Sequence, residues 1–244
     1  MKRTRSILIS ALISGLLVFT SGAATVVQTF DFDNINQGVP DGTGAGLVNV
    51  QNISSTIVDI TDVNVSLHLS GGMAPGFTGI NSDLYAYVQH SAGFAVLVNR
   101  PGIDGSNPFG YFDPGGIQVV FDDQGSDGDI HYYQDQGIFG VTGPVVGTFE
   151  PDARNIDSLF NTPAALGAEP RTAFLSTFNA LDASGNWTLY VEDMFGDTSQ
   201  YILESWSITV TGDDGMAVIP EASTGIPLLV LMLVGSWRFY TRRK

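Results

Sequence analysis

The sequence contains no cysteine, and between its two ends it contains no lysine. Without cysteine there is no disulfide framework, so stability must come from a hydrophobic core. The ten Lys and Arg residues gather at the termini, and the long middle segment keeps only Arg100, Arg154 and Arg171. Nearly all 25 acidic residues lie in that segment, which is therefore far more acidic than the whole-chain net charge of −15. Such a field repels phosphate and argues against nucleic acid as a partner.

The N-terminus has the three parts of a secretory signal peptide. Met1 to Arg5 is basic, Ile7 to Phe19 is apolar, and Ser21 to Ala24 offers small residues for cleavage. We predict that residues 1–23 direct the chain through the Sec translocon and are removed by signal peptidase after Ala23 or Ala24. The alternative is an uncleaved membrane anchor.

A second apolar run lies near the C-terminus, from Ile226 to Trp237, and is followed by Arg238 and the basic end Arg242 to Lys244. As a helix the run would span about 18 Å, against about 30 Å of hydrocarbon, and starting it at Val218 lengthens it. The basic end is expected to stay cytoplasmic. This pattern predicts a transmembrane helix; the alternatives are a buried core helix or a plain tail anchor.

The residues before this run add a motif: Pro220, Glu221, Ala222, Ser223 and Thr224. Together, residues 218–244 resemble the PEP-CTERM sorting signal, with Ala222 where a second proline is usual. The resemblance implies recognition at Pro220-Glu221 by an exosortase, a membrane cysteine transpeptidase. The protein would be anchored in the membrane transiently and then sorted to the cell surface or exopolysaccharide matrix of a Gram-negative bacterium.

Between the two ends, residues 24–211 alternate apolar and polar residues in short segments separated by Gly-rich turns. This pattern, with little helical periodicity, predicts an all-β fold, a jelly-roll-like antiparallel β-sandwich flanked by the signal helix and the transmembrane helix. Residues 212–217 are expected to form a polar linker. The predicted strands include 26–32, 57–69, 83–90, 94–98, 117–121, 185–193 and 203–210.

The last two strands carry a second resemblance, to the P domain (homo B domain) found beside subtilisin-like proprotein convertases. Its motif residues there are Gly185, Trp187, Leu189, Val191, Asp193, Leu203, Trp206 and Ile208, and Asp83 upstream matches the family's Asp-Leu step. The stretch from Ile130 to Pro170 has little that matches, and Gln200-Tyr201 stands where glycine is expected. The resemblance implies an eight-stranded jelly-roll-like sandwich without catalysis of its own. Strand alternation places Trp187 and Trp206 in the core rather than at a ligand.

No catalytic motif is present, because the three histidines (68, 90 and 131) lie in or near predicted strands without a nucleophile or zinc-site context. We therefore predict that the protein is not an enzyme. Paired carboxylates for glycoside cleavage are the alternative in so acidic a chain, although no spacing singles out a pair. The one cofactor that the sequence indicates is calcium, on the acidic loop of Asp122, Asp123, Asp127 and Asp129. Gly125 and Gln134 break the calcium-loop pattern, and the alternative is a solvated acidic turn.

These inferences predict a secreted, surface- or matrix-sorted, non-catalytic module with an adhesion or exopolysaccharide-associated role and a surface glycan as partner. The alternative is an accessory P-domain-like module linked to extracellular serine-type proteolysis. The two differ in whether the purified protein retains carbohydrate without turnover or is associated with proteolytic activity.

Overall fold

The structure, a computed structural model, describes residues 23–42, 44–72, 80–138, 143–196 and 200–217. Residues 24–216 form one compact unit. The predicted signal peptide lies outside the described residues except for Ala23, and so does the whole of the predicted sorting segment 218–244. Among the helices that are described, none has the length and apolar character needed to cross a bilayer.

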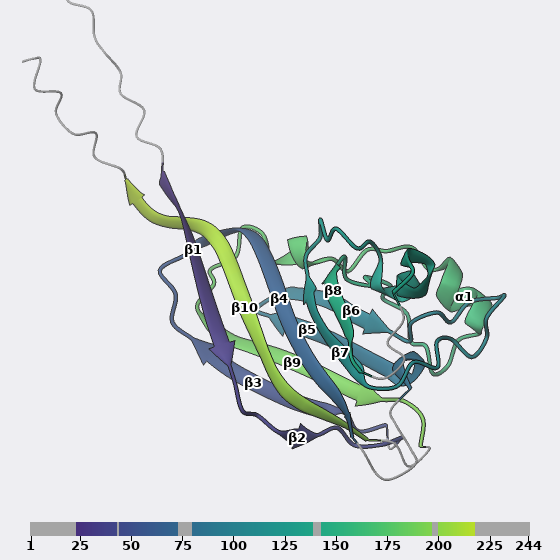
Figure 1. Cartoon of the computed structure of the whole chain (residues 1–244). Helices are drawn as coiled ribbons and strands as arrows, with labels where there is room; N and C mark the ends of the chain where they lie inside the picture. The colour runs from purple at the N-terminus through teal and green to yellow at the C-terminus, as the bar shows by residue number, and fades with distance from the viewer. Residues whose placement is uncertain (1–22, 43, 73–79, 139–142, 197–199, 218–244) are drawn as a thin grey trace, which may run out of the picture. The chain divides into compact units, whose positions relative to one another are not determined.

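The described strands form two sheets that pack face to face, as Figure 1 shows. The first sheet has the order β1 (Ala23–Phe32), β10 (Gln200–Ala217), β4 (Asp59–Gly72), β7 (Gly116–Phe121) and β8 (Val145–Phe149), with β2 (Gln37–Gly38) also paired to β10. The second has the order β3 (Leu47–Ile53), β9 (Gly185–Asp193), β5 (Leu84–His90) and β6 (Gly93–Asn99). The prediction of an all-β fold is confirmed at this level. The described helices are short: η1 (Asn81–Asp83), η2 (Ile130–Gln136), α1 (Pro163–Ala168) and η3 (Leu175–Phe178).

The alternation that predicted the strands is the alternation that builds the core. Side chains of one parity point inward from β4, β9 and β10 and are buried, whereas their neighbours along the strand are partly exposed. Both predicted core tryptophans are buried: Trp187 is 0% and Trp206 is 2% exposed. The Trp187 ring stacks on His90 with the ring centroids 4.2 Å apart. Burial of these apolar side chains is the main source of stability that a chain without disulfides can have.

One strand pair contradicts the prediction of a wholly antiparallel sandwich. Strands β7 and β8 are parallel, with Ile117 opposite Val145 and Phe121 opposite Phe149. Parallel neighbours need a crossover of about a dozen residues or more. The chain between the two strands contains η2, and its residues 139–142 lie outside the described residues. The direction of a short apolar strand leaves no mark in its own sequence, so the periodicity alone could not reveal this pair.

The segment predicted as a linker, residues 212–217, belongs to β10, which runs to Ala217. Gly212 pairs with Ile60 and Asp213 with Asp59, so backbone hydrogen bonds hold a stretch whose composition is typical of a loop. A Cβ at Gly212 would lie 2.3 Å from the carbonyl oxygen of Asp59, so glycine permits this close approach. Strand β10 lies beside β1, and the start of β1 and the end of β10 are at the same end of the sheet (Figure 1).

Candidate functional site: a tyrosine-lined groove

Three tyrosines gather on the outer face of the four-stranded sheet. Tyr85 and Tyr87 alternate with buried residues along β5, and Tyr190 does the same on β9. The register places Tyr87 directly opposite Tyr190 and Tyr85 opposite Glu192. The Tyr87 and Tyr190 rings stack with centroids 4.8 Å apart, and the Tyr85 ring stands edge-on to Tyr190 at 6.2 Å. Strand pairing therefore assembles a compact aromatic surface that faces away from the core.

A loop following β8 turns this surface into a groove. Residues 155–159, together with Gly44, Glu192 and Met194, line a hollow of about 500 Å³ over the three rings. The loop is fixed from below, because buried Asn99 donates from its amide nitrogen to the carbonyl oxygens of Arg154 and Ile156, at 3.0 and 3.1 Å. The Asp157 carboxylate accepts from the Leu159 backbone nitrogen at 3.0 Å. The loop of residues 155–159, which forms one side of the groove, is thus held in place by hydrogen bonds as well as by packing.

The polar groups of the groove are phenols and carboxylates. The Tyr190 hydroxyl donates to Glu192 Oε2 at 2.8 Å and accepts from the Gly46 backbone nitrogen at 3.1 Å. Burial, and then the hydrogen bond to Glu192, raise the pKa of Tyr190 to about 12. Burial also raises the pKa of Tyr85, with contributions from the neighbouring tyrosines and from the charges of Asp157 and Glu192. The phenols therefore stay protonated at neutral pH and act as hydrogen-bond donors beside apolar ring faces.

The aspartates predicted to bind calcium are each bonded to the chain itself. Asp122 Oδ1 accepts from the Gln124 nitrogen at 2.7 Å, and Asp127 Oδ2 from the Thr148 nitrogen at 2.7 Å. The two oxygens of Asp123 cap η3 by accepting from the backbone nitrogens of residues 175 and 176. Asp129 accepts from the backbone nitrogen of residue 131 and from the guanidinium of residue 154.

Within the described ranges, no three His, Asp or Glu side chains converge as metal ligands would. These hydrogen bonds make the four aspartates braces for the loops around β7, η2 and β8, and calcium binding by them stays a prediction.

The residues of the P-domain-like motif frame the core instead of lining the groove. Asp83 and Asp193 are buried, at 8% and 0% exposure, and the Met194 nitrogen bonds the carbonyl oxygen of Asp83. Gly185 has a φ of 120°, which favours glycine. The motif nevertheless positions the groove, because its inward residues force Tyr190 and Glu192 to the outer face of the same strand.

A buried network of charges, which the sequence did not predict, ties the loops together. At its centre, His131 Nδ1 donates to Asp152 Oδ2 at 2.7 Å, and both side chains are fully buried. His131 Nε2 faces the carbonyl oxygen of Ile103 at 3.1 Å. Because both ring nitrogens face acceptors, the site favours the doubly protonated imidazole. Burial opposes that charge, but Asp152 outweighs burial and raises the pKa of His131. Burial also disfavours the Asp152 carboxylate, yet His131 and then Arg154 lower its pKa.

Two of the three arginines of the middle segment join this network. Arg154 bridges Asp152 Oδ1 at 3.1 Å and Asp129 Oδ2 at 2.9 Å, and Arg171 pairs with Glu150 at 2.7 Å. The Asp–His pair looks like part of a catalytic triad. The second ring nitrogen of His131, Nε2, however, is hydrogen-bonded to the backbone carbonyl of Ile103, at the position where a triad would place the nucleophile. The arrangement is that of a structural ion-pair network.

The charge on His131 gives the fold a dependence on pH. A histidine whose pKa is raised on folding stabilises the protein fully below its unfolded pKa, and this contribution is lost as pH rises through the folded pKa. We expect the free energy of unfolding to fall as pH is raised above about 6.5, the ordinary histidine value. Urea unfolding of the full chain in a mild detergent at a series of pH values measures this. His131→Gln should flatten that fall; an equally steep fall in the variant would contradict the assignment.

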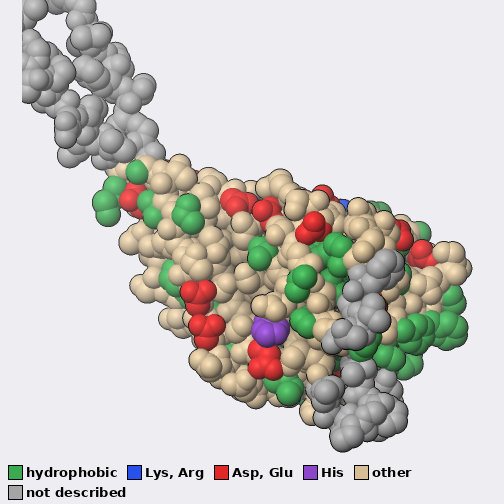
Figure 2. Space-filling view, viewed as in Figure 1, with side chains coloured by type: hydrophobic (Ala, Val, Ile, Leu, Met, Phe, Trp, Pro, Cys, Tyr) green, Lys and Arg blue, Asp and Glu red, His purple; other side chains and the backbone are tan. Residues whose placement is uncertain are grey.

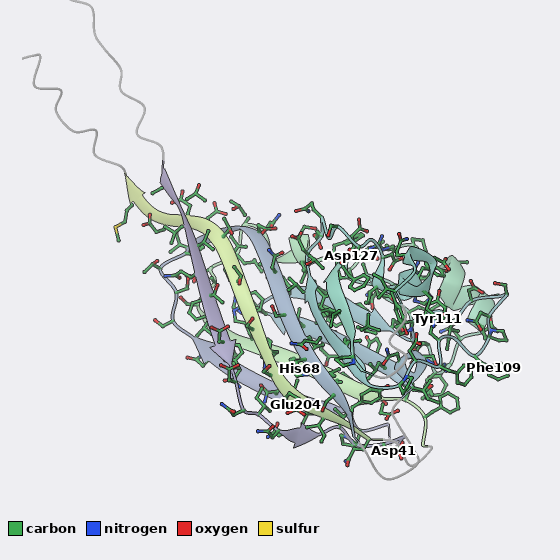
Figure 3. All side chains as sticks on the ribbon, in the orientation of Figure 1. Asp41, His68, Phe109, Tyr111, Asp127 and Glu204 are labelled. Carbon is green, nitrogen blue, oxygen red and sulfur yellow. The ribbon has the colours of Figure 1, made fainter. Side chains whose placement is uncertain are left out.

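Two other hollows lie on the described surface. One, of about 350 Å³, crosses the outer face of the six-stranded sheet and is lined by Asp31, Asp33 and His68 among others. Figure 3 shows His68 and Glu204 on this face, and Figure 2 shows acidic side chains scattered across it. The other, of about 400 Å³, lies beside Arg100 and is lined by exposed phenylalanines that include Phe109. Neither combines stacked aromatic rings with carboxylates as the tyrosine groove does.

Comparison with known proteins assigns no family. No family model matches the chain, and no curated protein matches it. Among solved structures, it is similar to the serine protease of Aeromonas sobria in complex with its chaperone, with a TM-score of 0.39 and 14% identity, covering 80% of this chain and 28% of that one. It is likewise similar to that protease alone, with a TM-score of 0.38 and 14% identity, covering 78% of this chain and 27% of that one. The chain thus spans less than a third of the length of these proteins.

Proposed function

We propose that the protein is an exported, surface- or matrix-sorted β-sandwich module without catalytic activity, and that it binds glycan in the tyrosine-lined groove. Its two sheets would form a jelly-roll-like, P-domain-like sandwich between a cleaved signal helix and a C-terminal transmembrane helix. The observation that carries the proposal is the groove itself: three ordered tyrosines, two of them stacked, beside the carboxylates of Asp157 and Glu192.

The chemistry of the groove suits a sugar. Sugar rings present an apolar face of C–H groups and an edge of hydroxyls, so they stack on aromatic rings and hydrogen-bond to phenols and carboxylates. Tyrosine offers both a flat apolar body and a polar tip. Concave sites with aromatic walls and a few convergent polar groups are typical of ligand pockets. Because the phenols of Tyr85 and Tyr190 stay protonated, they would serve a bound sugar as hydrogen-bond donors.

The placement of the groove supports display from a surface. In the unit formed by residues 24–216, the start of β1 and the end of β10 lie next to each other (Figure 1). The start of β9 lies at that end too, since residues 181 and 183 bond to residues 60 and 57 near the start of β4. Tyr190 and Glu192 lie towards the opposite end of β9. A module held by either chain end would present the groove away from its attachment.

Export and sorting depend on the terminal segments. Signal peptidase and the Sec translocon would act on residues 1–23, and an exosortase would act at Pro220-Glu221. Replacing both Pro220 and Glu221 with alanine in the native host should leave the C-terminal segment attached and the protein in the membrane fraction. Immunoblotting of membrane and matrix fractions measures this, and unchanged cleavage and release would contradict the sorting proposal.

Glycan binding is tested by retention of the full chain, in a mild detergent, on exopolysaccharide from the producing bacterium. Tyr87→Ala and Tyr190→Ala should each weaken retention about tenfold, because each removes a stacking surface worth about 1 kcal/mol or more. Tyr87→Phe, which keeps the ring, should retain most of the binding. Phe109→Ala removes an exposed aromatic outside the groove and is the matched control.

Equal retention of the wild type and both alanine variants would show that the groove is not the site. The protease-accessory alternative is examined with the same preparation. Activity on a protein substrate that disappears with a serine-protease inhibitor would favour that alternative over glycan binding.

A further inference from the structure

The groove carries negative charge and, among its described lining residues, no positive charge. Asp157 and Glu192 are its two ionisable acids, and no Lys or Arg lines it. The register sets Glu192 directly opposite Tyr85. Glu192 uses one oxygen to accept from Tyr190, which leaves the carboxylate with further acceptor capacity towards a ligand.

The guanidinium beside this loop is directed elsewhere. Arg100 Nε donates to the carbonyl oxygen of Ser82 at 3.2 Å, and its guanidinium lies 5.0 Å from the centre of the Phe195 ring. Its Nη1 reaches only the backbone oxygen of Ser158, at 3.4 Å. Arg100 thus lines the neighbouring hollow, where the carboxylate of Asp83 faces it. The other two arginines of the middle segment, Arg154 and Arg171, are paired in the buried network.

The surroundings do not offset the charge of the groove. Of the 25 acidic residues in the chain, all but Glu221 lie in residues 24–217, which contain only the three arginines just described. Ligands that carry carboxylate, sulfate or phosphate would therefore meet repulsion from the groove and from the surface around it. A ligand with an ammonium group would gain charge-assisted hydrogen bonds to the carboxylates.

We propose that the groove selects a polysaccharide that contains unacetylated hexosamine, whose positively charged 2-ammonium group is received by Glu192 and Asp157 while the sugar rings lie on the tyrosines. This inference rests on the glycan-binding function proposed above and names its substrate class. Acetylation of the amine removes the charge and enlarges the substituent, so the degree of acetylation becomes the property that the groove distinguishes.

The test compares retention of the full chain, in a mild detergent, on four polymers: chitosan, chitin, a neutral β-glucan and alginate. We expect retention in the order chitosan, then chitin and glucan, then alginate, with the chitosan advantage falling as salt is raised. Glu192→Gln keeps an acceptor for the Tyr190 hydroxyl but removes the charge. It should weaken binding to chitosan about fivefold and binding to chitin by a clearly smaller factor, because only chitosan loses a charge-assisted contact.

Asp182→Asn is the matched control, because Asp182 is an exposed aspartate outside the groove and its loss changes net charge equally. Equal binding to chitosan and chitin, or an equal effect of the two charge variants, would overturn the amino-sugar inference while glycan binding stands. If the protein is retained neither on any of the four polymers nor on the native exopolysaccharide, the proposed function itself is overturned. Polylysine serves as a polycation without sugar rings. If it binds the wild type and Tyr87→Ala equally, and the wild type shows no preference among the sugar polymers, cation binding is non-specific attraction to an acidic surface, and the inference is likewise overturned.

Discussion

Asp152→Asn should lower the free energy of unfolding by about 3–5 kcal/mol, the usual effect of removing one partner from a buried ion pair. The Asp152 carboxylate is fully buried and receives the His131 imidazole at 2.7 Å and the Arg154 guanidinium at 3.1 Å. It also accepts from the Asn99 backbone nitrogen at 3.2 Å. An amide of the same shape leaves the His131 imidazole without its counter-charge and Arg154 with Asp129 as its remaining acidic partner, and it turns a donor towards other donors.

Urea unfolding of the full chain in a mild detergent, followed by tryptophan fluorescence, measures the effect. The midpoint should fall without a large change in slope, as expected for a loss of stability in a two-state transition. Asp182→Asn, at an exposed position, makes the same chemical change and should leave the midpoint in place. If the two variants unfold alike, the buried network does not contribute as proposed.

Trp187→Ala should lower the free energy of unfolding by about 3–5 kcal/mol, because it leaves a large cavity between the two sheets. The Trp187 ring stacks on His90 and packs against Phe178, with ring centroids 4.2 and 4.9 Å away. Its indole nitrogen donates to the carbonyl oxygen of Ala183 at 3.0 Å. The strand that carries it also carries Tyr190, so the variant should weaken glycan retention as well.

Thermal unfolding of the same preparation follows this variant, and Val146→Ala is its control because Val146 is 58% exposed on β8. At about 2–4 °C per kcal/mol, the Trp187→Ala midpoint should drop by roughly 10 °C, and that of the control by far less. A drop of only a degree or two in Trp187→Ala would show that the ring is not the centre of the core.

The sequence predicted the strands well where one face is buried and the other is not. On β4 the alternating residues Val63, Val65, Leu67 and Leu69 correctly predicted both the strand and the face that is buried. The apolar residues of β9 did the same. It failed where pairing rather than composition decides the structure. The parallel β7–β8 pair and the continuation of β10 through Gly212 to Ala217 depend on neighbours that are distant in sequence.

The groove could have been predicted in part. Strand alternation places Trp187 in the core together with Leu189 and Val191, and this pattern necessarily places Tyr190 and Glu192 on the other face. What it lacked was the register that sets Tyr87 opposite Tyr190. The buried network was harder to foresee, because His131 in the short helix η2 and Asp152 in a loop lie 21 residues apart in segments without periodicity. One indication was available in the sequence: basic residues are scarce. Since the middle segment has three arginines and an excess of acidic residues, each arginine is expected to pair with a carboxylate.

The proposed function depends most directly on whether sugars contact Tyr85, Tyr87 and Tyr190. The chain has eight tyrosines, so NMR spectra of the full chain with isotope-labelled tyrosine rings contain internal controls, such as the buried Tyr133 and Tyr201. Titration with an oligosaccharide released from chitosan should shift the resonances of the three groove tyrosines and leave those of Tyr133 and Tyr201 in place. A saturating titration that shifts other tyrosines instead, or none at all, would contradict the account.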